Sequence, residues 1–172
     1  MLKDIILRIR TEFVAENTPP QCGEAPLLSE MEEDRVLDQV LGPPPEEEDG
    51  DVLELTTEAV WSDDGKGIVI GYEESELSGM EGTTTVIAFS KAEPTMVTVS
   101  REGTYSSTLI LEQGKSHTGQ YQTPVMPLEV TTRTHRLVNR LLEDGTLEAD
   151  YTVRVGTITT SRSRLHIQVR EE

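Results

Sequence analysis

Residues 68–89 read IVIGYEESELSGMEGTTTVIAF, and the pattern of this stretch decides the fold. Ile68, Ile70 and Tyr72 fall on one side of an extended chain, because strand side chains alternate between two faces. Residues 83–89 begin with three threonines, which are β-branched and favour strands. The stretch therefore predicts two antiparallel strands joined by an acidic loop that contains glycines.

The same short alternating runs recur along the rest of the chain and are separated by turn residues. Residues 147–155 alternate apolar with polar side chains, and the Gly-containing sequences at 63–65 and 143–145 are typical of hairpin turns. A helix is an alternative for residues 134–142, but the threonines before them favour a strand. Roughly ten strands with little helix and no βαβ rhythm predict an all-β fold.

An up-and-down antiparallel barrel and a β-sandwich both fit such regular hairpin spacing. The one-sided alternation indicates an apolar inner face and a polar face toward water. We expect the barrel, because closing the sheet removes its open edges.

The composition suits a globular protein. The chain has 172 residues, 35% of them hydrophobic, with a mean hydropathy of -0.39 and no apolar run long enough to span a bilayer. Charges at Lys3, Asp4 and Arg8 interrupt the first apolar segment and argue against a secretory signal. The single cysteine, Cys22, excludes an internal disulfide framework, so we expect a cytoplasmic protein.

The net charge of -17 is concentrated near the N-terminus. Residues 12–51 contain thirteen acidic residues and one basic residue, Arg35. Affinity for nucleic acid and for anionic membranes comes from lysine and arginine. We therefore expect neither nucleic acid nor a membrane as a partner.

Residues 14–50 are acidic and rich in proline, and they cannot form a packed core of their own. We expect a single domain over residues 1–172, in which this segment is an insertion between the first and second strands. Ser29 and Glu32 form a capping-box pattern at the start of one short predicted helix. The helix carries a narrow apolar stripe at helical spacing. Its residues are Val36, Leu37, Val40 and Leu41.

Several strings outside this insertion resemble the YwiB-like proteins, a family of small bacterial proteins. The resemblance covers residues 2–11 and 51–172. It is carried by Tyr72-Glu73-Glu74-Ser75, Leu77, Gly79, Glu81-Gly82-Thr83-Thr84-Thr85, Arg101, Gly103, Tyr121, Thr123-Pro124 and Leu128. It implies a calycin, lipocalin-like β-barrel and a domain of unknown function. The resemblance implies a fold and no activity.

No catalytic motif is present in the sequence. We find no Ser-His-Asp order, HExxH, CxxC or phosphate-binding loop. His117, His135 and His166 lie on different predicted strands, whereas a histidine metal site needs its ligands at one point. Cys22 has no activating basic neighbour. We expect no metal and no cofactor, and an enzyme is the least favoured function class.

Two function classes remain open. In the first, the barrel interior binds a small, mostly apolar molecule, since barrels of this size can enclose one. Strand parity places Arg101 on the inner face with Val97 and Val99, and it places Glu74 on the inner face with Tyr72. The candidate ligand-binding residues are Tyr72, Glu74, Arg101, Tyr121 and Tyr151. The alternative is that side chains fill the barrel completely.

In the second class, the protein binds another protein through the acidic insertion. A helix of this length is marginal in water by itself, so its apolar stripe should dock on a surface. That surface is either the protein's own domain or a partner. The stripe Val36, Leu37, Val40 and Leu41 is the candidate partner-binding site.

Overall fold

The structure, a computed structural model, describes residues 1–14, 51–156 and 158–171. Their secondary structure consists of ten strands and one short 3-10 helix, in agreement with the predicted all-β class. Residues 134–140 belong to a strand, as the threonines before them suggested. The elements are β1 Leu2–Val14, β2 Val52–Asp63, β3 Gly67–Glu73, η1 Glu76–Ser78, β4 Thr83–Ser90, β5 Glu93–Gly103, β6 Ser106–Glu112, β7 Ser116–Gln122, β8 Pro127–Arg140, β9 Thr146–Val155 and β10 Ile158–Glu171.

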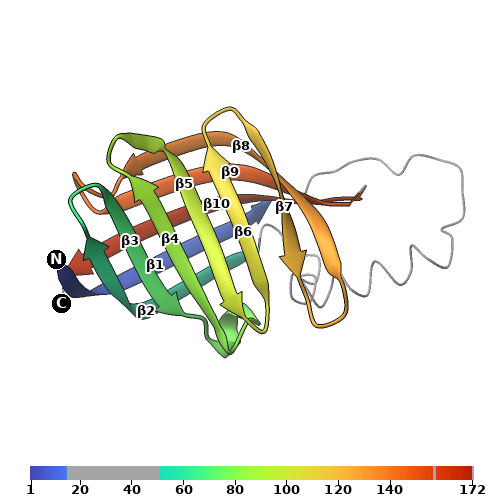
Figure 1. The fold of residues 1–172 in the computed structure, drawn as a ribbon, viewed down its shortest axis with the longest axis horizontal. Helices are drawn as coiled ribbons and strands as arrows, with labels where there is room; N and C mark the ends of the chain where they lie inside the picture. Colours follow the sequence, from blue (N-terminus) through green and yellow to red (C-terminus); the bar gives the residue numbers. More distant parts are fainter. Residues whose placement is uncertain (15–50, 157, 172) are drawn as a thin grey trace, which may run out of the picture.

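The strands form one closed antiparallel barrel (Figure 1). Each strand pairs with its neighbours in sequence, and the barrel closes where β1 pairs with β10. This closing ladder runs from Ile5 opposite Glu171 to Val14 opposite Arg162. The prediction of a closed barrel rather than a sandwich is therefore confirmed.

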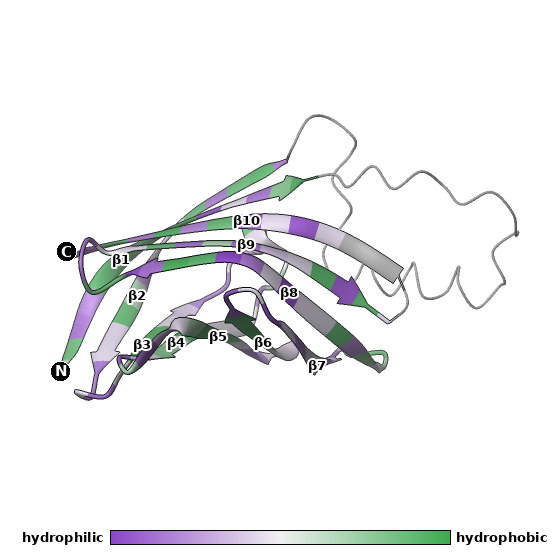
Figure 2. Ribbon diagram, turned by 90° about the horizontal axis from the view of Figure 1, so that it is seen from above, coloured by the Kyte–Doolittle hydropathy of each residue, from purple (hydrophilic) through white to green (hydrophobic). Residues whose placement is uncertain are grey.

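Two walls of different strand length face each other across the barrel (Figure 2). One wall contains β8, β9, β10, β1 and β2, which have 10 to 14 residues each, and the other contains β3–β7, which have 7 or 8 residues apart from β5 with 11. The ladder between β6 and β7 is short, with only two residue pairs. The turn after β6 is held by β8 instead, since Gly114 N donates to Thr134 O at 3.0 Å and Thr134 N donates to Lys115 O at 3.0 Å.

The alternating pattern fills the interior with apolar side chains from both walls, and the buried residues form two separate clusters. The larger cluster includes the fully buried Leu7, Ile68, Ile70, Val97 and Leu147. The smaller cluster consists of Tyr121, Val130, Val153 and Val155. Leu109 and Tyr151 are partly buried and pack against both clusters.

No helix among the described residues is long and apolar enough to cross a membrane. The predicted helix, its stripe of Val36, Leu37, Val40 and Leu41, and Cys22 all lie outside the described residues, so these features stay predictions. One boundary changes, because Val14, expected at the start of the insertion, belongs to β1 and pairs with Arg162.

We predict that the barrel folds without residues 15–50. Phe13 N donates a hydrogen bond to Asp51 O at 3.0 Å, so the two chain ends at this point already lie side by side. Replacing residues 15–50, 36 in all, with a four-residue turn rich in Gly and Asn reduces the entropic cost of closing this loop. The free energy of unfolding should therefore stay constant or rise by up to about 2 kcal/mol. Chemical denaturation of both proteins measures this, and a fall of several kcal/mol would show that the segment belongs to the core.

Candidate functional site

A row of polar side chains crosses the inner face of the short-stranded wall. Its members are direct cross-strand neighbours: residue 72 lies opposite 85, 85 opposite 101, 101 opposite 107, and 107 opposite 121. The polar row consists of Tyr72, Thr85, Arg101, Ser107 and Tyr121. Four of these residues are buried, and the side chain of Arg101 is 21% exposed. A continuous line of hydrogen-bonding groups therefore runs through the barrel from β3 to β7.

Glu74 lies beside this row. Its backbone N donates to Thr83 O at 2.9 Å, which extends the β3–β4 pairing beyond the end of β3 and keeps the Glu74 side chain on the inner face. The Glu74 carboxylate is 3% exposed. Its Oε1 accepts a hydrogen bond from Thr85 Oγ1 at 2.6 Å and lies 3.9 Å from Arg101 Nε. Glu74 and Arg101 thus lie together, as strand parity suggests.

Arg101 has unused hydrogen-bonding capacity. The distance of 3.9 Å to Glu74 is an ion-pair distance and exceeds that of a hydrogen bond. Arg101 Nε is closed to solvent and has no hydrogen-bond partner among the described residues. The buried hydroxyls of Ser75, Thr83 and Ser107 also lack a partner among the described residues, as does that of Thr134 on β8 in the other wall. Each such group costs about 1–3 kcal/mol when it stays unsatisfied, so this side of the interior is unusually polar for a core.

Three tyrosines surround the Arg101 guanidinium. Burial raises the pKa of the Tyr72, Tyr121 and Tyr151 hydroxyls, and the positive charge of Arg101 opposes this rise in all three. The Glu74 charge is the second cause of the raised pKa of Tyr72. The phenols therefore stay neutral at physiological pH and can donate hydrogen bonds. Tyr105 packs against Tyr121 with ring centroids 6.4 Å apart, so all four tyrosines of the chain gather here.

The polar row lies where the apolar core is interrupted. Tyr72 belongs to the larger apolar cluster and Tyr121 to the smaller one. Small domains usually have one contiguous core. Here, a row of partly unsatisfied polar groups lies next to the boundary between two apolar clusters.

The loops nearest the polar row follow β3, β5 and β7, at the lower edge of the barrel in Figure 1. Leu77 in η1 and Val125 and Met126 before β8 are exposed apolar side chains on two of these loops. Gly103, with φ of 137°, passes so close to β4 that a Cβ atom would collide with the carbonyl oxygen of Gly82. These glycines keep β4 and β5 in tight contact beside Arg101.

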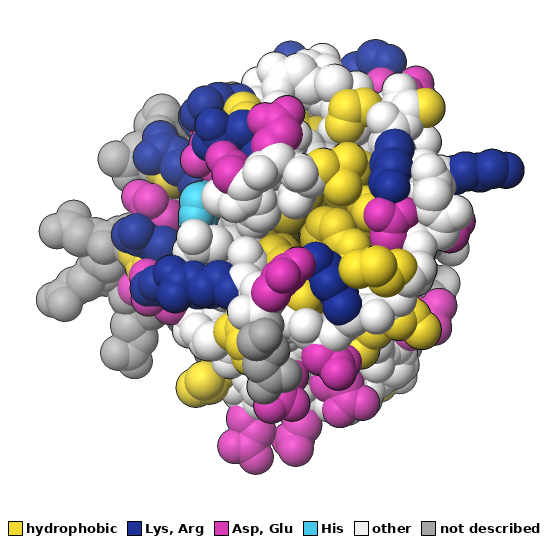
Figure 3. Space-filling model, turned by 90° about the vertical axis from the view of Figure 1, so that its left-hand side faces the viewer, with side chains coloured by type: hydrophobic (Ala, Val, Ile, Leu, Met, Phe, Trp, Pro, Cys, Tyr) yellow, Lys and Arg dark blue, Asp and Glu magenta, His cyan; other side chains and the backbone are white. Residues whose placement is uncertain are grey.

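Figure 3 shows the surface of the side of the molecule that carries both termini. Hydrophobic side chains gather at its centre, and acidic and basic side chains surround them. Apolar surface is therefore visible between the strand ends on this side.

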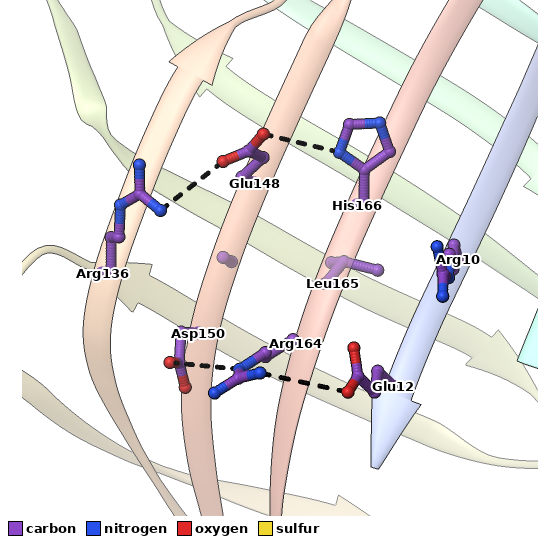
Figure 4. A pocket seen from close by; sticks show the side chains of 9 residues that line it. Arg10, Glu12, Arg136, Glu148, Asp150, Arg164, Leu165 and His166 are labelled. Carbon is purple, nitrogen blue, oxygen red and sulfur yellow. Dashed lines mark ion pairs between the residues drawn. The ribbon is translucent and has the colours of Figure 1, made fainter. Parts of the chain in front are cut away.

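A hollow on the outer face of β8, β9, β10 and β1 contains charged side chains of both signs (Figure 4). Glu148 lies 3.7 Å from both Arg136 and His166, and Arg164 lies between Asp150 and Glu12 at 3.8 and 3.9 Å. Acidic and basic groups alternate across the hollow and balance one another. This outer surface therefore has no excess charge with which to select an ion.

The histidines lie at three separate places. His117 is 2.7 Å from Glu112, His135 is 2.8 Å from the hydroxyl of Thr152, and His166 lies in the outer hollow. Within the described ranges, no group of three or more His, Cys, Asp or Glu residues could hold a metal ion.

The structure brings together the five ligand-binding candidates proposed from the sequence. Tyr72, Arg101 and Tyr121 belong to the polar row, Glu74 lies beside it, and Tyr151 reaches it from the opposite wall. The partner-binding candidates Val36, Leu37, Val40 and Leu41 lie outside the described residues and stay predictions.

Sequence reasoning missed Thr85 and Ser107, which complete the polar row. The same strand parity could have found them, because Thr85 alternates with Ile87 and Ser107 alternates with Leu109. Tyr105 gave no such signal, since it lies in the turn between β5 and β6.

Comparison with known proteins agrees with this fold. The family described as "Domain of unknown function (DUF1934)" matches residues 44–167. The chain is similar to the crystal structure of the ywiB protein from Bacillus subtilis, with a TM-score of 0.66 and 13% sequence identity. That match covers 99% of this chain and 93% of the other, and at this identity it shows the fold alone. No curated protein matches. The resemblance to YwiB-like proteins is confirmed.

We predict that Thr85→Val destabilises the barrel. The substitution keeps the side-chain shape but removes the hydroxyl that donates to the buried Glu74 carboxylate. Loss of a hydrogen bond to a charged group should lower the free energy of unfolding by about 2 kcal/mol. Thr84→Val is the matched control, because Thr84 is exposed on the same strand. Equal denaturation curves for the two variants would contradict the proposed role of Thr85.

We also predict a pH-dependent contribution from Asp150. Arg162 binds Asp150 through two hydrogen bonds of 2.8 and 2.9 Å and holds the pKa of Asp150 below its ordinary value. A lowered folded-state pKa adds stability above the unfolded-state pKa, and this stability is lost as the pH falls through the folded-state pKa.

Asp150→Asn should therefore lower the free energy of unfolding by at most about 1 kcal/mol near neutral pH, because both side chains are partly exposed. In strong acid the substitution should leave the free energy of unfolding unchanged. Urea denaturation from neutral pH to about pH 2 measures the difference, with Glu129→Gln on the exposed face of β8 as control. A constant difference across that range would contradict the prediction.

Proposed function

Because this chain belongs to the DUF1934 family, whose description assigns no activity, we propose a function from the barrel itself: it is a binding module for a small, mostly apolar molecule. Antiparallel barrels such as the lipocalins hold one small ligand in their interior, and we place this chain with such calycin-like binding barrels. The single cysteine and the acidic composition agree with a cytoplasmic role.

The observation that carries this proposal is Arg101 Nε, which is buried and lacks a hydrogen-bond partner among the described residues. The hydroxyl of Ser107, directly opposite on β6, and that of Thr83, two positions before Thr85 on β4, are in the same condition. A filled core does not normally retain several unsatisfied groups in one place. A bound molecule would complete these hydrogen bonds and would cover the apolar residues on either side of them.

The apolar part of the ligand has suitable contacts nearby. Leu109 and Tyr151 each pack against both apolar clusters and are only partly buried. The rings of Tyr105 and Tyr121 add a second apolar wall. Binding buries these surfaces, and at about 25 cal/mol per Å² of apolar area even a small ligand gains useful affinity.

Protein binding through the acidic insertion is the other function that the sequence suggests. The helix and the apolar stripe on which it depends lie outside the described residues. The proposal of protein binding therefore rests on the sequence alone, and we favour ligand binding in the barrel interior.

We predict that Ser107→Leu blocks ligand binding without destabilising the free protein. If the barrel interior has room beside Ser107, the larger side chain fills that room. If side chains already fill the barrel, overpacking should lower the free energy of unfolding by about 1–3 kcal/mol. Thr108→Leu, at an exposed position on the same strand, is the matched control.

Native mass spectrometry of the purified full-length protein gives the second readout. We expect the native protein and Thr108→Leu to retain a small molecule that is released on denaturation, and Ser107→Leu to have lost it. Destabilisation of Ser107→Leu, together with no retained molecule in the native protein, would refute the binding function.

A further inference from the structure

The unsatisfied groups around Arg101 share one property, which is that they can all donate hydrogen bonds. Arg101 Nε is a donor only, and the hydroxyls of Thr83 and Ser107 can each donate. Burial keeps the nearby phenols of Tyr72 and Tyr121 neutral, and the Tyr72 phenol already hydrogen-bonds Glu74. The missing partner must therefore be a group rich in hydrogen-bond acceptors.

The acceptor already present does not meet this demand. Glu74 Oε1 accepts from Thr85 Oγ1 at 2.6 Å, whereas its distance to Arg101 Nε is 3.9 Å. Glu74 therefore lies close enough to attract and orient the guanidinium, but it does not bind the N–H groups. The planar fork of an arginine matches a carboxylate or a phosphate, which accept two parallel hydrogen bonds.

The charge of the site separates these two anions. Glu74 and Arg101 together are neutral, and both are largely removed from water. A monoanion adds one negative charge, which the guanidinium and the surrounding donors can offset. A phosphate monoester carries about two charges near neutral pH and would be repelled more strongly by Glu74. The site therefore favours a monoanionic group.

Resting on the binding function proposed above, we infer that the ligand is an organic carboxylate with an apolar body. Its carboxylate binds the Arg101 guanidinium, and Ser107, directly opposite on β6, donates to the same group. Thr83 contributes from β4. The apolar body lies against the tyrosine rings and Leu109. Arg101 sets the specificity for the anionic head, whereas the apolar surfaces supply the remaining affinity.

Titration calorimetry with four probes of equal chain length tests this inference: octanoate, octan-1-ol, octylamine and octyl phosphate. We expect octanoate to bind about tenfold or more tightly than octan-1-ol, which is the size of one charge-assisted contact. In Arg101→Met this preference should disappear, and in Arg101→Lys it should be reduced. Arg133→Met, at an exposed arginine on β8, should keep the native preference.

A second measurement does not depend on the variants. The NMR signal of the Arg101 Nε–H in the native protein should shift on addition of octanoate and stay in place with octan-1-ol. Three results would each refute the inference that the ligand is a carboxylate. The first is octan-1-ol binding as tightly as octanoate, and the second is octyl phosphate or octylamine binding more tightly than octanoate. The third is an Nε–H signal that does not shift. If octan-1-ol binds and Ser107→Leu abolishes its binding, the proposed binding function stands even though the carboxylate inference is refuted. If no probe binds and no molecule is retained, both proposals fail.

Discussion

The hydrogen-bonded ladder between β1 and β10 is the constraint on which the rest of the structure depends. It joins the first strand to the last over the register from Ile5–Glu171 to Val14–Arg162 and converts a meander of hairpins into a closed surface. Closure gives every strand an inside and an outside and leaves no open edge. Each alternate side chain must then be accommodated in one enclosed volume, whatever its polarity.

The polar groups inside that volume are costly, because they have left water without gaining full partners. Buried charge is tolerated only where it is paired and hydrogen-bonded. Glu74 meets this requirement through Thr85, whereas Arg101 is paired with Glu74 but its Nε has no hydrogen bond among the described residues. Native proteins are stabilised by only about 5–15 kcal/mol in total, so several unsatisfied groups in one place are a large energetic cost. Unsatisfied polar groups of this kind are typical of functional sites.

The ion pairs on the outer face of the barrel differ in geometry from the pair on its inner face. On the outer face, Arg162 forms two hydrogen bonds with Asp150, and Arg136 and Arg164 in the hollow lie beside carboxylates (Figure 4). On the inner face, Arg101 Nε and Glu74 Oε1 stay 3.9 Å apart, with Glu74 almost closed to solvent and the Arg101 side chain 21% exposed. Surface ion pairs are weak and screened by salt, whereas an incomplete pair inside the barrel keeps a strong capacity to bind.

The sequence by itself determined the strands and the face on which each side chain lies, because a period of two residues is a local property of the chain. Ile70, Tyr72 and Glu74 are thus placed on one face without any knowledge of the fold. Only the tertiary structure decided which residues become neighbours across strands. Thr85, Arg101 and Ser107 belong to three consecutive strands, and their alignment depends on the register of β4, β5 and β6. The turns set that register only once the strands pair, and the closure by β1 and β10 joins the two ends of the chain through long-range pairing, which no local pattern specifies.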